Sequence, residues 1–173
     1  GNLTGDVTGD VTGDLTGTVL TAAQTNITSL GTLTGLTVNG NVSVDGGTIK
    51  LDGNFPTGTD NVALGNTAGN SIQSGGNYNT VVGNNAGTAI TTGDSNVALG
   101  NNTLTTSTTS SFNTAIGAAS LQLNVTGANN SATGYGALYS NTTASNNTAN
   151  GYFALFANTT GTNNVAVGQG SLT

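Results

Sequence analysis

Apolar and polar positions follow two different patterns along this chain of 173 residues, and the pattern changes near residue 58. In the second part, an element of the form Asn-small-Ala-aliphatic-Gly, or a close variant of it, recurs seven times. The copies begin at Asn61, Asn79, Asn96, Asn113, Asn130, Asn147 and Asn164, so the first step is 18 residues and each later step is 17. Such a fixed period is typical of a repeat protein in which each period forms one structural unit.

Two positions of the repeat, numbered from its Asn as position one, carry the apolar signal. Position three is Ala in six copies and Val81 in the other, and strand alternation places it opposite positions two and four. Position nine is Gly69 and Gly87 in the first two copies and then Leu104, Leu121, Leu138, Leu155 and Leu172. We expect a narrow interior or a tight subunit seam at position three, and buried Leu side chains that contribute roughly 1.5 to 3 kcal/mol each.

The period predicts an all-β fold, a parallel β-solenoid over residues 58–173. Seventeen residues are too few for a helix pair and suit one coil with two short strands joined by Gly, Asn and Ser turns. Like positions would then stack about 4.8 Å apart, so six complete coils would extend about 30 Å. A coil this small leaves no room for an enclosed ligand, so function would lie on the outer surface.

Stacking also predicts ladders of identical side chains. The Asn of position one would form an amide ladder in which each side chain bonds the next, and Asn129, Asn146 and Asn163 would form a second ladder. Position five would allow a backbone angle closed to other residues, or a close approach of neighbouring chain. It is glycine in every copy: Gly65, Gly83, Gly100, Gly117, Gly134, Gly151 and Gly168.

Residues 1–57 predict an extended Gly/Thr-rich shaft with short strands. Apolar residues recur every four residues in the LTGDVTGD tract, but Thr and Gly at each step disfavour a helix. Residues 22–30 could form a short helix, residues 32–44 and 48–52 read as strands, and residues 53–60 are the expected junction. Asp6, Asp10 and Asp14 could in principle bind Ca²⁺. Solvated carboxylates are the favoured interpretation, because a hard cation needs several oxygen ligands at one point and this tract does not bring them together.

Composition changes this picture mainly by exclusion. Lys50 is the only basic residue, which argues against nucleic acid binding, and the apolar runs are too short to insert into a membrane. Cysteine and histidine are absent, so thiolate metal sites, disulfides and His-based catalysis are excluded. The single carboxylate after Asp60 is Asp94, which cannot form a catalytic pair within one chain, so we predict no enzyme activity, no cofactor and no metal. No initiator Met or signal peptide is visible, which suggests a processed chain or an excised piece.

Copies such as NTAIGAASLQLNVTGANN and NTANGYFALFANTTGTNN resemble the head repeats of trimeric autotransporter adhesins. They resemble even more closely the longer-period version in phage tail-fibre-like proteins, and the AAQTNITSLGTLTGLTVNGNVSV and LTGDVTGD segments look like phage fibre shafts. The resemblance implies a left-handed parallel β-roll, three chains about one axis and a role in adhesion. The 17-residue period departs from the shorter autotransporter repeat, which puts the loops in doubt.

Aromatic residues gather late in the chain, and two interpretations of them stay open. Stacked rings can bind the apolar faces of sugars, whereas the favoured reading is that they close the core or a subunit seam. The residues concerned are Tyr135, Tyr139, Tyr152, Phe153 and Phe156. Asn-x-Ser/Thr triplets at Asn26, Asn41, Asn124, Asn141 and Asn158 are expected by chance in such a composition.

These features together predict a structural and adhesive fibre segment, on a phage tail fibre or a similar appendage, that attaches to a host cell surface. The chain would be a homotrimer on a virion or at an extracellular cell surface, with a host glycan or another receptor as its partner. The alternatives are a bacterial trimeric surface adhesin and, with less support, an ice-binding solenoid, because Thr142-Thr143 and Thr159-Thr160 stack one period apart. The sequence does not distinguish a phage origin from a bacterial one.

Overall fold

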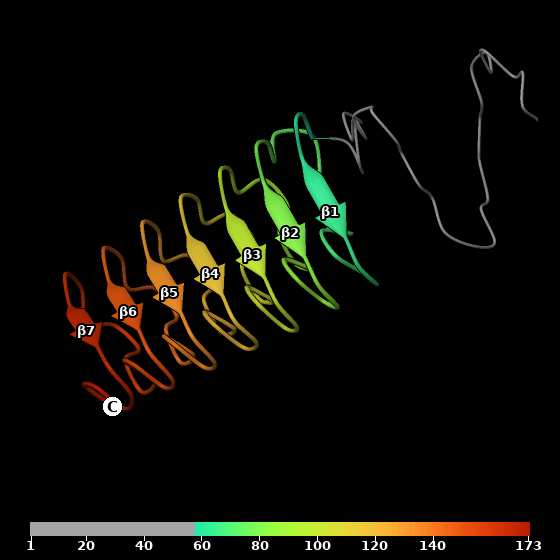
Figure 1. Ribbon diagram of the computed structural model, residues 1–173. Helices are drawn as coiled ribbons and strands as arrows, with labels where there is room; N and C mark the ends of the chain where they lie inside the picture. The colour runs from blue at the N-terminus through green and yellow to red at the C-terminus, as the bar shows by residue number, and fades with distance from the viewer. Residues whose placement is uncertain (1–57) are drawn as a thin grey trace, which may run out of the picture. The chain divides into compact units, whose positions relative to one another are not determined.

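A computed structural model of the protein describes residues 58–173, which form a β-solenoid of about six turns (Figure 1). Within this range there are seven parallel strands of three residues each and no helix. The strands are β1 (Val62–Leu64), β2 (Thr80–Val82), β3 (Val97–Leu99), β4 (Thr114–Ile116), β5 (Ser131–Thr133), β6 (Thr148–Asn150) and β7 (Val165–Val167). The predicted all-β fold, a parallel β-solenoid, is therefore confirmed.

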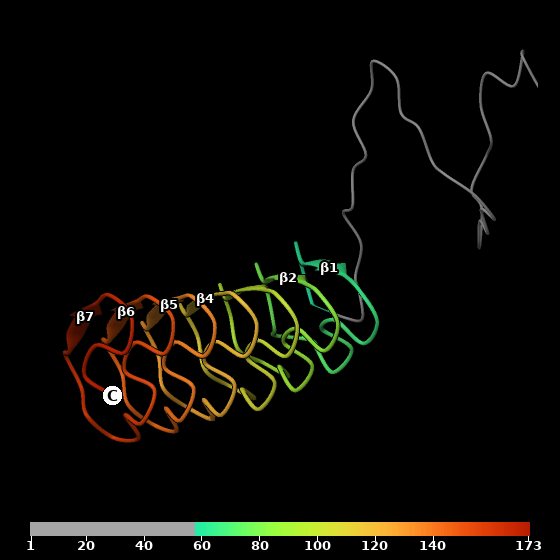
Figure 2. The same cartoon turned by 60° about the horizontal axis from the view of Figure 1, so that its bottom comes forward.

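One strand from each coil joins a single sheet whose order, β1 to β7, is the order of the sequence. The register pairs equivalent positions of successive repeats, so that Ala98 lies beside Ala115 and Ala115 beside Ala132. Backbone hydrogen bonds between neighbouring coils continue outside the strands, for example from the Leu121 N–H to the Ala137 carbonyl at 3.0 Å. The coils therefore stack directly upon one another, as the turned view makes plain (Figure 2).

The prediction of two strands in each repeat is wrong, because the second half of each coil is a series of turns. Repeat positions seven and nine have positive φ throughout, as at Phe153 (55°) and Leu155 (51°). A left-handed residue reverses the chain locally and cannot continue a strand. Short turn bonds follow, such as that from the Asn158 N–H to the Leu155 carbonyl at 3.2 Å.

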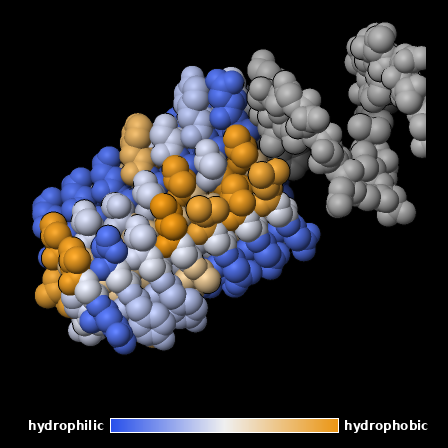
Figure 3. All heavy atoms as spheres, viewed as in Figure 1, coloured by the Kyte–Doolittle hydropathy of each residue, from blue (hydrophilic) through white to orange (hydrophobic). Residues whose placement is uncertain are grey.

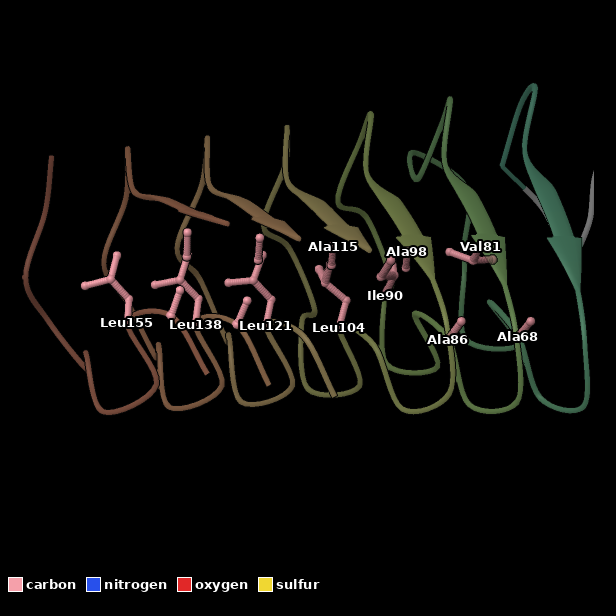
Figure 4. Packing of buried hydrophobic residues seen from close by; sticks show 14 of the residues in the cluster. Ala68, Val81, Ala86, Ile90, Ala98, Leu104, Ala115, Leu121, Leu138 and Leu155 are labelled. Carbon is pink, nitrogen blue, oxygen red and sulfur yellow. The ribbon is translucent and has the colours of Figure 1, made fainter. Parts of the chain in front are cut away.

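The interior is narrow and filled by side chains of positions three and nine, as expected (Figure 4). Position three is buried from Val81 to Ala166, while Ala63 in the first coil is half-buried. Leu104, Leu121 and Leu138 are fully buried, but Leu172 in the last coil is 62% exposed. The first two coils have Gly at position nine and bury Ile72 and Ile90 at position twelve instead.

Several expectations fall outside the described residues. They are the shaft over residues 1–57 with its strands and short helix, the carboxylates Asp6, Asp10 and Asp14, and most of the junction at residues 53–60.

Candidate functional site

The Asn of position one joins each coil to the next. Its side-chain oxygen accepts a hydrogen bond from the backbone N–H of the Asn in the following coil, at 2.8 to 3.0 Å at all six steps. A bond between two side-chain amides is present at three steps, for example from Asn96 Nδ2 to Asn79 Oδ1 at 3.1 Å. The contacts between coils are therefore mainly amide to backbone, which differs from the expected amide-to-amide ladder.

The same side chains also close their own coils. Each Nδ2 of the first six Asn residues donates to a backbone carbonyl near the end of the same repeat, at 2.8 to 2.9 Å, as in Asn61 to Gly76 and Asn130 to Ala144. Both ends of each amide are therefore used. Since most of these amides are fully buried, each removal would leave polar groups without partners, at roughly 1 to 3 kcal/mol per group.

Asn129, Asn146 and Asn163 do not form the predicted second ladder. Their φ angles are positive (58° to 63°), their side chains are exposed, and no hydrogen bond joins one side chain to another. Their backbone N–H groups instead bond to the preceding coil, for example Asn146 to Ala128 at 3.1 Å. Asn suits this position because it tolerates the left-handed conformation better than most residues.

A different second ladder lies inside the stack at position twelve. Asn141 Nδ2 donates to Asn124 Oδ1 at 2.8 Å, and Asn158 Nδ2 donates to Asn141 Oδ1 at 3.2 Å. The spacing of 17 residues between these three Asn residues was the signal in the sequence. Asn124 and Asn141 are completely buried, so neither is accessible as a glycosylation acceptor in the folded chain.

The glycines of position five in the first six repeats lie close against the backbone of the next coil. Their φ angles run from 114° to 145°, a region that side chains rarely adopt. A Cβ on Gly65 would lie 2.5 Å from the Gly83 carbonyl oxygen, and one on Gly117 would lie 2.7 Å from that of Gly134. Both the backbone angle and the close approach therefore require glycine here.

The five late aromatic residues form one connected cluster on coils five and six. Tyr135 and Tyr152 stack with ring centroids 5.5 Å apart and an interplanar angle of 15°, and Tyr139 stacks on Phe156 at 5.1 Å. Phe153 links the two rows through contacts to Tyr135 at 5.3 Å, Tyr152 at 4.3 Å and Phe156 at 4.6 Å. The Phe153 ring covers Gly136 of the coil below, where a Cβ would collide with it.

Only two of these rings are well exposed, Tyr135 at 50% and Tyr152 at 49%. Because they stack on each other along the axis, one face of each ring is turned toward its neighbour. The other three rings are half-buried. The solvent-exposed part of the cluster therefore consists of the two Tyr side chains, and the other three rings pack mainly within the cluster.

The sheet turns a second apolar surface outward. Leu64 is 48% exposed, Leu99 45% and Ile116 36%, and all three occupy position four of their repeats. Figure 3 shows the hydrophobic colour gathered over β1 to β4 and again at the end of the stack near β7, with polar residues between. Those polar residues are Thr133 and Asn150 at the same position of β5 and β6.

Carboxylates are sparse on residues 58–173, where Asp60 and Asp94 are the only two. Asp94 Oδ1 accepts a hydrogen bond from the Asn77 N–H at 2.7 Å, so this carboxylate connects two coils. Within the described range there is no group of three or more residues that could hold a metal ion.

The chain matches no protein-family model, no curated protein and no solved structure. Over residues 58–173, no helix has the length and apolar character needed to cross a membrane.

Proposed function

We propose that this chain is a structural and adhesive segment of a phage tail fibre or a similar appendage, which mediates attachment to a host cell surface. It acts without catalysis and works as a homotrimer on a virion or outside a cell. The observation that carries the proposal is the stack itself. Coils that repeat in register build a straight spacer, and its length grows by about 4.8 Å for each coil added.

The way the coils are held together suits a load-bearing fibre. Every junction between coils combines strand pairing, further backbone bonds and one buried Asn amide. The interior contains packed aliphatic side chains, so the surfaces left for recognition are external. A chain built in this way holds a binding surface at a distance from the body that carries it.

An ice-binding role has less support from the outward face of the sheet. An ice-binding face requires Thr at both outward positions of successive strands, whereas β2 pairs Thr80 with Val82 and β4 pairs Thr114 with Ile116. A bacterial surface adhesin remains the second candidate, because a trimeric surface fibre would be built on the same kind of stack.

Immunoelectron microscopy of the source material tests the proposal. An antibody raised against residues 58–173 should label filaments that leave a capsid-bearing particle, and its Fab fragments should reduce attachment of the particles to host cells. Antibody absorbed beforehand with the purified chain is the control. Label on filaments of a cell envelope would favour the bacterial adhesin, and label confined to the cell interior would contradict both.

A further inference from the structure

Each coil places one large apolar or aromatic side chain at one of two neighbouring outward positions, four or six. In five coils it stands at position four, as Leu64, Val82, Leu99, Ile116 and Val167. In the other two coils position four is polar, Thr133 and Asn150, and the large side chain moves to position six as Tyr135 and Tyr152. No coil has both, and no coil lacks one.

Position six is correspondingly small or polar in the five coils that have an aliphatic residue at position four. It is Asn66, Asn84, Asn101, Ala118 and Gln169 in those coils. This exchange is hard to attribute to the interior, because positions four and six both face away from it. We call the seven large side chains the outer stripe.

Backbone hydrogen bonds show how the outer stripe changes position between coils. Ile116 pairs with Thr133 of the next coil, and the Gly134 N–H bonds to the Ile116 carbonyl at 2.8 Å, so Tyr135 lies two residues after the partner of Ile116. Tyr135 then stacks on Tyr152 in the next coil at 5.5 Å. The Gly168 N–H bonds to the Asn150 carbonyl at 2.8 Å and brings Val167 beside it, where the stripe returns to position four.

Two features indicate what covers this stripe. Its side chains recur once per coil along the whole stack, so a partner that matches it must carry apolar groups at the same rise. A second copy of this chain has that rise by construction. Residues 58–173 contain two acidic and no basic residues, so a second copy meets little repulsion, whereas a charged partner would find almost no opposite charge.

We infer that the outer stripe is the contact surface between copies of this chain, which pack side by side with their stacks parallel and their stripes turned toward a shared axis. The inference rests on the proposed function and locates the homotrimer contact within it. Cyclic symmetry places like coils at the same height. The change from position four to position six is then matched in every copy. It also assigns Tyr135 and Tyr152 to assembly, because a sugar platform would account for two coils of the stripe and leave the other five unexplained.

Sedimentation analysis of the full chain tests the inference with three variants. The wild type should have three times the 16.8 kDa mass of one chain. Leu99→Ser and Tyr135→Ser should each weaken association at least about tenfold. Val125→Ser is the matched control, since Val125 is 41% exposed but lies outside the stripe, and its assembly should not change. Circular dichroism of each variant verifies that the coils remain folded.

Single cysteines give a second readout, because the chain has none of its own. Oxidation of the Leu99→Cys variant should yield covalent dimers, whereas Val125→Cys should yield none, because only residues near a shared axis meet their own copies. A monomeric wild type would overturn the inference. It would also be overturned if the Val125→Ser control dissociated to the same extent as Leu99→Ser and Tyr135→Ser. Monomers that still adhere to host cells would leave the proposed attachment intact. If Tyr135→Ser loses sugar binding while its mass is unchanged, the glycan interpretation is correct instead.

Discussion

The first two coils and the four that follow fill the same interior in opposite ways. In residues 61–95 position nine is Gly and position twelve is the buried Ile72 or Ile90. In residues 96–163 position nine is a buried Leu and position twelve is Ser107, Asn124, Asn141 or Asn158. Each coil therefore holds one large aliphatic side chain, from one position or from the other.

The geometry shows that the two side chains compete for one space. A Cβ on Gly87 would lie 2.6 Å from a Val81 methyl group and 2.8 Å from Ile90 Cδ1. The Ile of position twelve thus occupies the volume that Leu takes in later coils (Figure 4). Positions nine and twelve are therefore coupled, because each coil has room for a large aliphatic side chain at only one of them.

The two arrangements have different costs. Leu104, Leu121, Leu138 and Leu155 adopt φ angles of 47° to 51°, a left-handed conformation that costs roughly 1 to 2 kcal/mol for a residue with a side chain. Gly avoids this cost. A polar residue at position twelve also needs partners, and Asn124 Nδ2 finds the Gly127 carbonyl at 2.9 Å, which it shares with Asn113. Burial of the Leu side chain offsets the strained backbone.

The largest expected effect comes from removing a Leu of position nine. Leu121→Ala should lower the free energy of unfolding by roughly 2 to 5 kcal/mol, because the surrounding coils cannot collapse onto the cavity. Leu121→Gly should be no more destabilising than Leu121→Ala, because φ is 48° there and Gly adopts this angle without strain. Urea unfolding followed by circular dichroism measures both.

A buried residue of strand β4 supplies the control for the two Leu121 variants. Ala115 is fully buried in β4 with ordinary strand geometry, so Ala115→Gly should destabilise the chain in the usual way. A Leu121→Gly variant clearly less stable than Leu121→Ala would show that the left-handed backbone does not determine the choice between Leu and Gly.

The next effect in size comes from placing large side chains at both position nine and position twelve of one coil. Gly87→Leu should cost roughly 2 to 4 kcal/mol, from overpacking against Ile90 together with the left-handed backbone. Adding Ile90→Asn should recover part of this loss, since coil two then has the arrangement of the later coils. A double-mutant cycle by urea unfolding gives the coupling, and strictly additive effects would contradict the pairing of the two positions.

Much of the fold could be predicted because the repeat fixes which residues stack. The period and the small residue at position three were sufficient for the solenoid and its interior. The single strand per coil was not predictable, since Thr67, Ala119 and Phe153 share a left-handed position without any common side-chain property. Position twelve was missed because Ile90 and Asn124 look unrelated until each is considered together with position nine.

The candidate surfaces were predictable only in part. The spacing of Tyr135 and Tyr152 revealed that they stack, but the sequence did not show that three other rings lie half-buried among them. The sequence period did not reveal the outer stripe, because its side chains change between positions four and six and so break strict periodicity. Exposure of each side chain was needed to connect them.

The smallest effect concerns a third ladder that is continuous in the early coils and interrupted in the later ones. Two residues before the repeat Asn, a side-chain oxygen accepts the backbone N–H of the preceding coil. Asn77 Oδ1 accepts from Thr59 at 2.9 Å, Asp94 Oδ1 from Asn77 at 2.7 Å, and Ser111 Oγ from Asp94 at 2.9 Å. The next residue in the series, Ala128, has no side-chain oxygen, so the Ser111 N–H receives no such bond.

Ala128→Ser should therefore repair the ladder and raise the free energy of unfolding by roughly 0.5 to 1.5 kcal/mol, the usual net value of one hydrogen bond. The same kind of bond already exists one coil later, where Ser145 Oγ accepts from the Ala128 N–H at 3.0 Å. Ser111→Ala removes the equivalent bond to Asp94 and should lower the free energy of unfolding by a similar amount. The melting temperatures of the two variants should then shift in opposite directions. Equal and opposite shifts would show that each bond of this ladder contributes to the stability of the stack by itself, whereas a neutral Ala128→Ser would show that water already satisfies the Ser111 N–H.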